Sequence, residues 1–150
     1  MATIFDQIVD GSMKAWKVWE DDNYLAFLTP FPNTPGVTIL IPKVNQGDYL
    51  FNLNDEQYQD LLVATKKVAK LLERAFDTSR VALAFEGTGV AHVHAKLIPL
   101  HGKLADETNV WSKHKEFNTD YLGYLTTAEG PKMSDEELDT IQAKILGAAS

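Results

Sequence analysis

Polar and hydrophobic residues alternate along residues 90–98, and this two-residue period is typical of a β-strand. The side chains at positions 92, 94, 96 and 98 would lie on one face of the strand, and the apolar side chains between them would face a core. Pro99 lacks the amide hydrogen that would extend the ladder, so we expect the strand to end there. The first face then carries His92, His94, Lys96 and Ile98.

Four further segments predict the rest of a mainly antiparallel, five-stranded sheet. Apolar residues from Trp16 to Phe27 flank an Asp- and Asn-rich turn, which is typical of a β-hairpin. Residues 37–41 are continuously apolar, as in a buried central strand. Residues 81–85 form a short strand that would pair antiparallel with residues 90–98. The fold class that these segments predict is α+β.

Two helices are predicted beside this sheet. Asn54 is followed by acidic residues and Gln57, which resembles a capping box, and apolar residues then recur at helical spacing to residue 76. Ser134 with Glu137 indicates the start of a C-terminal helix, and residues 121–127 suggest one more strand. We expect a domain over residues 1–102 and a C-terminal extension, residues 103–150, packed on the same domain.

The composition narrows the class of protein. A length of 150 residues with 45% hydrophobic content suits one compact domain with a real core. The net charge of −7 argues against general binding to nucleic acid or anionic membranes, although a small anionic ligand needs only a local positive site. Cysteine is absent, which excludes disulfides and thiolate metal sites. With no long apolar run and no basic N-terminal segment, we expect a cytoplasmic protein.

The polar face of the predicted strand is the main candidate for chemistry. Imidazole is a competent nucleophile, acid and base near neutral pH. The preceding turn, Gly87-Thr88-Gly89, can direct backbone N–H groups and a hydroxyl toward an anion. From the residues alone, three interpretations stay open: a catalytic or phosphate-binding row, a pair of histidine metal ligands, and structural histidines.

The run from His92 to Pro99 resembles the signature of the histidine triad (HIT) family of nucleotide hydrolases and transferases. Further blocks resemble the other conserved blocks of that family and follow in the same order, so the resemblance covers about residues 3–102. These blocks are residues 3–8, 18–27, 35–43 and 54–76.

The resemblance implies a covalent mechanism. The middle histidine of the motif, His94, would attack the α-phosphorus of a nucleoside phosphoramidate or dinucleoside polyphosphate, and water would then hydrolyse the nucleotidyl-histidine. His92 would orient the nucleophile. No cofactor is implied. Many bacterial members hold a structural zinc with a cysteine pair near residues 3–6, and because this chain has no cysteine we predict no zinc or other metal.

Lys96 stands where the family usually carries its third histidine. The substitution keeps a positive charge but changes the proton chemistry, because an unperturbed lysine titrates near pH ~10.4. Lys96 is therefore expected to clamp phosphate, unless it is an ordinary surface lysine. His101 is a candidate for the missing proton donor, with a surface loop histidine as the alternative.

The resemblance also implies a nucleotide-binding set. Phe5 and Phe27 match apolar positions that line the base pocket, and Thr29 replaces an aspartate that often contacts the ribose. The segment before the motif is shorter than usual, so phosphate contacts would come mainly from its backbone and from Thr88. The expected nucleotide-binding residues are Phe5, Phe27, Thr29, Phe85, Gly87, Thr88 and Gly89.

The resemblance also implies partners, and two alternative functions stay open. The expected partner is a small nucleotide substrate, and relatives are commonly homodimers, so we expect a homodimer to which Trp111 could contribute. One alternative is a nucleotide-binding or sensing protein with little or no turnover. The other is a metal site built from His92, His94 and His101.

Overall fold

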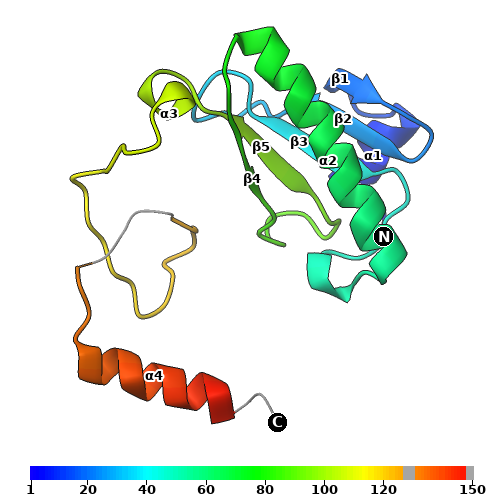
Figure 1. Cartoon of the computed structure of the whole chain (residues 1–150). Helices are drawn as coiled ribbons and strands as arrows, with labels where there is room; N and C mark the ends of the chain where they lie inside the picture. Colours follow the sequence, from blue (N-terminus) through cyan, green and yellow to red (C-terminus); the bar gives the residue numbers. More distant parts are fainter. Residues whose placement is uncertain (127–130, 148–150) are drawn as a thin grey trace. The chain divides into compact units, whose positions relative to one another are not determined.

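The computed structural model describes residues 1–126 and 131–147 of the chain (Figure 1). It divides the chain into two compact units, Met1–Val110 and Trp111–Ser150, which are described separately. The first unit contains the entire sheet, and its boundary lies eight residues beyond the expected residue 102. Packing of the C-terminal extension on this unit stays a prediction, as does homodimer formation.

The described residues of the first unit contain one five-stranded sheet, and every neighbouring pair of strands is antiparallel (Figure 1). The strand order is β1-β2-β3-β5-β4. This arrangement confirms the predicted α+β class, the N-terminal hairpin and the pairing of the last two strands. The strands are β1 (Trp16–Glu20), β2 (Tyr24–Leu28), β3 (Thr38–Pro42), β4 (Val81–Ala84) and β5 (Ala95–Pro99).

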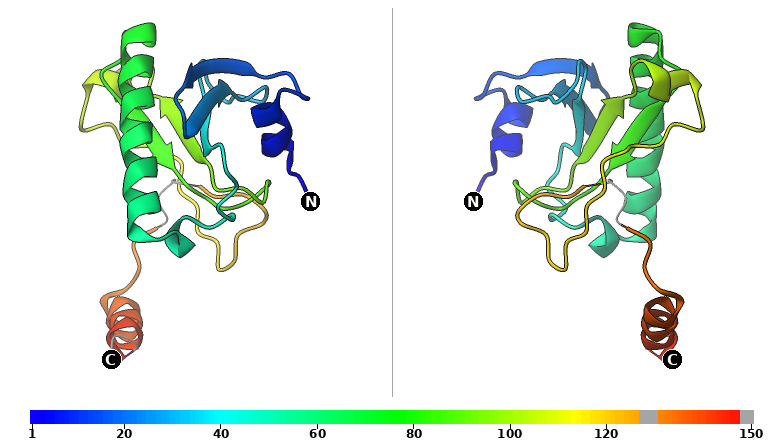
Figure 2. Two further views of the ribbon diagram at one scale, coloured as in Figure 1. Left: turned by 90° about the vertical axis from the view of Figure 1, so that its right-hand side faces the viewer. Right: turned by 90° about the vertical axis from the view of Figure 1, so that its left-hand side faces the viewer.

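One face of the sheet is covered by the long helix α2, Asp55–Phe76 (Figures 1 and 2). The predicted capping box is present, because the side chain of Asn54 accepts from the Gln57 amide and the Gln57 side chain accepts from the Asn54 amide. The buried side of α2 packs on the sheet in a core cluster. Its members include Leu40, Leu61, Val68, Leu72, Val93 and Leu97.

The opposite face carries α1, Ile4–Asp10, a helix that the hydrophobic pattern did not predict (Figure 2). At seven residues it is too short to display a helical period. It is instead stabilised at its start, where Thr3 and Asp6 form a capping box. Its inner residues form a second core cluster with the sheet, which includes Phe5, Ile8, Leu25, Phe27, Ile39 and Ile41.

The predicted motif strand is shorter than expected, because β5 begins at Ala95 rather than at residue 90. The amide of His92 donates to the carbonyl of Val90 (2.8 Å), and the amide of Val93 donates to the carbonyl of Gly47 (2.6 Å), so neither amide extends the ladder. His92 and His94 therefore lie on the segment leading into β5. The strand ends at Pro99, as predicted.

Three further helical segments complete the described structure: the 3-10 turn η1 (Leu50–Asn52), α3 (Lys103–Asp106) and α4 (Asp135–Gly147). The predicted capping box of α4 is confirmed by the bonds between Ser134 and Glu137. Residues 121–126 form no strand, and Thr127, the end of that prediction, lies outside the described residues. Among the described residues, no helix has both the length and the apolar character needed to cross a bilayer.

Candidate functional site

A pocket of about 320 Å³ opens on the face of the sheet that α1 covers. Its walls come from α1 and the connection to β1, from the end of β2 and the proline-rich loop, and from the glycine turn before β5. The first wall includes Ile4, Phe5, Ile8, Met13, Lys14 and Trp16. The second includes Phe27, Leu28, Thr29, Pro30 and Phe31, and the third includes Thr88, Gly89, Val90, His94 and Lys96.

His94 lies in the wall of this pocket with only 5% of its surface exposed. Its Nδ1 is 2.8 Å from the carbonyl oxygen of His92, and because a carbonyl can only accept, Nδ1 must carry the proton. Nε2 has no hydrogen-bond partner among the described residues. Burial lowers the pKa of His94, so the ring is neutral at pH 7 and Nε2 carries a free lone pair.

His92 is fully buried behind His94. Its Nε2 donates to the carbonyl of Pro42 on β3 (2.7 Å), and its Nδ1 faces the Thr3 hydroxyl (3.4 Å) and the Asp6 carboxylate (3.6 Å). The ring also contacts Phe5 edge to face, with centroids 5.8 Å apart. The ring of His92 therefore anchors the segment to β3 and α1, while its backbone carbonyl orients His94.

Lys96 is the charged group beside the nucleophile candidate. Its ammonium pairs with the carboxylate of Glu86 at 3.1 Å, and about a third of the lysine side chain (36%) is exposed. The Thr88 hydroxyl lies 3.5 Å from the same carboxylate. Lys96 thus lines the pocket with its charge partly balanced, and an incoming anion would compete with Glu86 for it.

The glycine turn connects β4 to the histidines. Gly87 and Gly89 have φ angles of 71° and 88°, in the left-handed region that favours glycine. A Cβ on Gly87 would also lie 3.3 Å from the Asp48 carbonyl, so the chain passes close to a neighbouring loop there. Gly89 and Thr88 line the pocket, whereas Gly87 shapes the turn behind them.

Seven of the eleven predicted site residues line the pocket, whereas His92, Phe85, Gly87 and His101 do not. Phe85 packs against the core beneath α2. His101 follows β5, whereas His94 precedes it, and a five-residue strand separates them by roughly 15 Å. Nε2 of His101 donates to the Pro35 carbonyl (2.7 Å). His101 therefore does not line the pocket, and its role as a proton donor stays a prediction that this arrangement does not favour.

The pocket also contains residues that the sequence did not single out as functional. Met13, Lys14 and Trp16 lie on the connection that follows α1, and Lys14 Nζ lies 5.5 Å from the centre of the Trp16 ring. Phe31 belongs to the proline-rich loop. No local pattern marks these positions, because they become neighbours only once α1 and the loop pack on the sheet.

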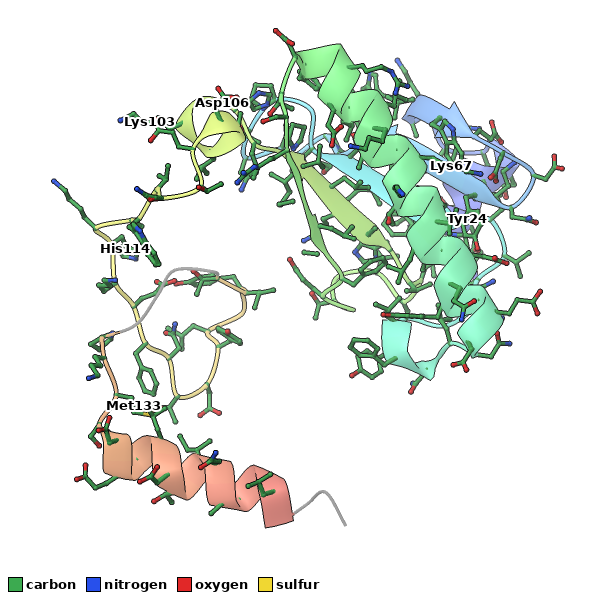
Figure 3. The ribbon with its side chains drawn as sticks, viewed as in Figure 1. Tyr24, Lys67, Lys103, Asp106, His114 and Met133 are labelled. Carbon is green, nitrogen blue, oxygen red and sulfur yellow. The ribbon has the colours of Figure 1, made fainter. Side chains whose placement is uncertain are left out.

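The structure does not bring His92, His94 and His101 together into the metal site that was considered as an alternative. Among the described residues, no group of three or more His, Asp or Glu side chains could hold a metal ion. His92 and His101 each use Nε2 to bind a main-chain carbonyl. The fourth histidine, His114, lies in the second unit (Figure 3). Its Nε2 lies 3.3 Å from the carboxylate of Glu116.

Comparison with known proteins identifies the family. Residues 11–103 match the HIT domain model. The protein hit of Bacillus subtilis is 30% identical over 118 residues, which cover 75% of this chain and 81% of that protein. The crystal structure of a HIT family member from Bacillus subtilis is 27% identical, covers 98% of this chain and 96% of its own, and has a TM-score of 0.65.

A HIT family hydrolase from Legionella pneumophila is also similar, at 28% identity and a TM-score of 0.59 over 67% of this chain and 95% of its own. The match of the family model spans more than half of the chain, and these relatives share its fold at 27–28% identity. The chain belongs to the HIT domain family.

Proposed function

We propose that the protein is a nucleotidyl hydrolase or transferase, in which His94 becomes transiently bonded to the α-phosphorus of a nucleoside phosphoramidate or dinucleoside polyphosphate. The observation that supports this most directly is the state of His94. Its Nδ1–H is bound to the His92 carbonyl at 2.8 Å, and its Nε2 is free in the wall of a pocket. A neutral, oriented imidazole is ready to act as a nucleophile.

In the first step, the Nε2 lone pair forms a bond to phosphorus while the bond from phosphorus to the leaving group breaks. The leaving group takes the electron pair of that bond. The proton on Nδ1 stays on the ring, and the His92 carbonyl stabilises the cationic nucleotidyl-imidazole that results. Water then attacks the same phosphorus, the N–P bond breaks, its electron pair returns to Nε2, and a proton from the water passes to solvent.

The charge that develops on the phosphoryl oxygens would be met from two sides. Lys96 contributes a cation on β5, and the turn that contains Thr88 and Gly89 contributes backbone N–H groups and a hydroxyl. Such preorganised donors act on the transition state more strongly than water does. The apolar wall, with Phe5 and Phe27 at an edge-to-face distance of 5.5 Å, suits the flat ring of a purine base.

Trapping the covalent intermediate tests this proposal. The full-length protein is mixed with adenosine 5′-phosphoramidate, quenched within milliseconds and analysed by intact mass. We expect an acid-labile adenylyl adduct on the wild type and on His114→Ala, which removes a histidine of the second unit. We expect none on His94→Ala. An adduct of equal yield on His94→Ala would overturn the assignment of the nucleophile.

A second candidate is a nucleotide-binding protein without turnover. The ion pair between Lys96 and Glu86 favours it, because a balanced lysine stabilises a transition state less than a free one does. This candidate predicts that AMP binds to the protein but that no adduct forms and no AMP is released from the phosphoramidate. The same trapping experiment, combined with AMP titration, therefore separates the two candidates.

A further inference from the structure

None of the described polar side chains that line the pocket carries a negative charge. Lys14 and Lys96 are cations, Trp16 is a hydrogen-bond donor, and Thr29 and Thr88 carry hydroxyls. Apart from these and His94, the lining is apolar or glycine. Among the described lining residues there is no carboxylate and no carboxamide. The pocket is thus equipped for an anion and an apolar ring, but it lacks a strong side-chain acceptor.

Two carboxylates lie near the site, and both are engaged elsewhere. Asp6 accepts from the Thr3 amide at 2.7 Å, and this bond is the largest cause of the lowered pKa of Asp6. Glu86 pairs with Lys96 at 3.1 Å. Neither side chain lines the pocket.

The hydroxyl of Thr29, at the start of the proline-rich loop, already accepts a hydrogen bond within the protein. Thr29 Oγ1 accepts from the Phe31 amide at 3.2 Å, and the Thr29 amide donates to the Val37 carbonyl at 3.2 Å. These two bonds tie Thr29 to the loop that follows β2. Its side chain therefore maintains the loop and offers no charged acceptor to a ligand.

Proteins that recognise a ribose commonly accept hydrogen bonds from its hydroxyls with a carboxylate. Bonds to a charged acceptor are stronger than bonds to a neutral one. On the basis of the function proposed above, we infer that this site does not recognise the sugar hydroxyls. It should therefore bind and cleave 2′-deoxy- and 2′,3′-dideoxynucleotide conjugates as readily as ribonucleotide conjugates. Its substrate class is an apolar ring joined to a reactive phosphoryl group, with the sugar acting as a spacer.

Selectivity between the ribo and deoxy forms of a nucleotide is expected to be weak. A site built to bind a hydroxyl rejects an analogue without it by about 10⁴-fold or more, because the buried group of the protein is left unpaired. Here removal of the sugar hydroxyls leaves no charged group of the described lining unpaired. We therefore expect the deoxy and ribo forms to differ by less than about tenfold.

Binding and turnover together test the inference. AMP, dAMP and 2′,3′-dideoxyAMP are titrated into the full-length protein by calorimetry, and AMP and dAMP release are measured from the matching phosphoramidates. Dissociation constants and kcat/KM values within about tenfold of each other support the inference. A loss of about 100-fold or more for either deoxy form overturns it. If binding is equal but neither phosphoramidate is cleaved, the inference stands and the proposed catalytic function fails.

A substitution in the loop sharpens the result. Thr29→Asp places a carboxylate in the lining of the pocket, and we expect it to create a preference of about tenfold or more for AMP over dAMP. Thr29→Asn is the matched neutral control and should create little preference. If wild type already prefers AMP by about 100-fold and Thr29→Asp adds nothing, an acceptor other than a carboxylate reads the ribose.

Discussion

The two ends of the motif are held in place by different kinds of contact. His92 and His94 are buried, and each ring donates a hydrogen bond to a main-chain carbonyl. Lys96 lies two residues further on, is partly exposed, and is held by the side chain of Glu86. The difference shows that the nucleophile candidate is positioned by the backbone, whereas the phosphate clamp depends on a side-chain ion pair that a ligand can replace.

Apart from loss of His94 itself, removal of the cation should have the largest effect. Lys96→Met keeps the length of the side chain but removes the charge that would stabilise the phosphoryl transition state. We expect kcat/KM for the phosphoramidate to fall by about 100-fold. Lys96→Arg, which keeps the charge, should recover part of the loss in the same assay. A loss below about threefold for Lys96→Met would show that Lys96 is an ordinary surface lysine.

Loss of the first histidine should act on stability. His92→Ala leaves a cavity and a buried Pro42 carbonyl without its donor, so we expect the free energy of unfolding to fall by about 2–3 kcal/mol. Adduct yield per folded molecule should persist, because a backbone carbonyl orients His94. Urea unfolding and intact mass measure the two quantities. Unchanged stability with lost adduct would instead assign a direct role to the ring.

Release of the lysine from its partner should have a smaller effect. Glu86→Gln removes the carboxylate that competes with a phosphate for Lys96. Because a partly exposed ion pair contributes little, we expect AMP to bind about two- to fivefold more tightly by calorimetry. Glu86→Asp, which keeps the charge, serves as the control. Weaker AMP binding in Glu86→Gln would mean that Glu86 holds Lys96 in the productive position.

The pH profile reports on the buried end of the motif. Burial is the largest cause of the lowered pKa of His94, and Lys96 lowers this pKa further, while the His92 carbonyl and Glu86 oppose the shift. The ring therefore gains its proton at a lower pH than an ordinary histidine, and the acidic decline of kcat/KM should shift to lower pH accordingly. A decline centred at pH ~7 or above would contradict a buried, neutral nucleophile.

The smallest effect is expected for a histidine outside the pocket. His101 also donates to a main-chain carbonyl, but it lies beyond β5 against Phe76. We expect His101→Ala to change kcat/KM by less than about twofold, with the adduct still formed. A loss comparable to that of Lys96→Met would instead support His101 as a proton donor.

Local signals in the sequence were sufficient for much of the fold and part of the site. Helical spacing and the Asn54 cap predicted α2, and the apolar run 37–41 predicted β3 within one residue. The glycine turn and the histidine pair were also recognisable. These features depend on neighbours within a few residues, so they can be read along the chain.

The tertiary structure alone decided how the motif residues are used. His92 bonds to Pro42, fifty positions earlier, His101 bonds to Pro35, and Lys96 pairs with Glu86 across the turn. The two histidine contacts join segments that become neighbours only when the sheet and the loops pack together, and the ion pair forms within the hairpin of β4 and β5. Strand period places side chains on a face, but long-range packing selects which of them enter the pocket, and for that reason His94 and Lys96 line it while His101 does not.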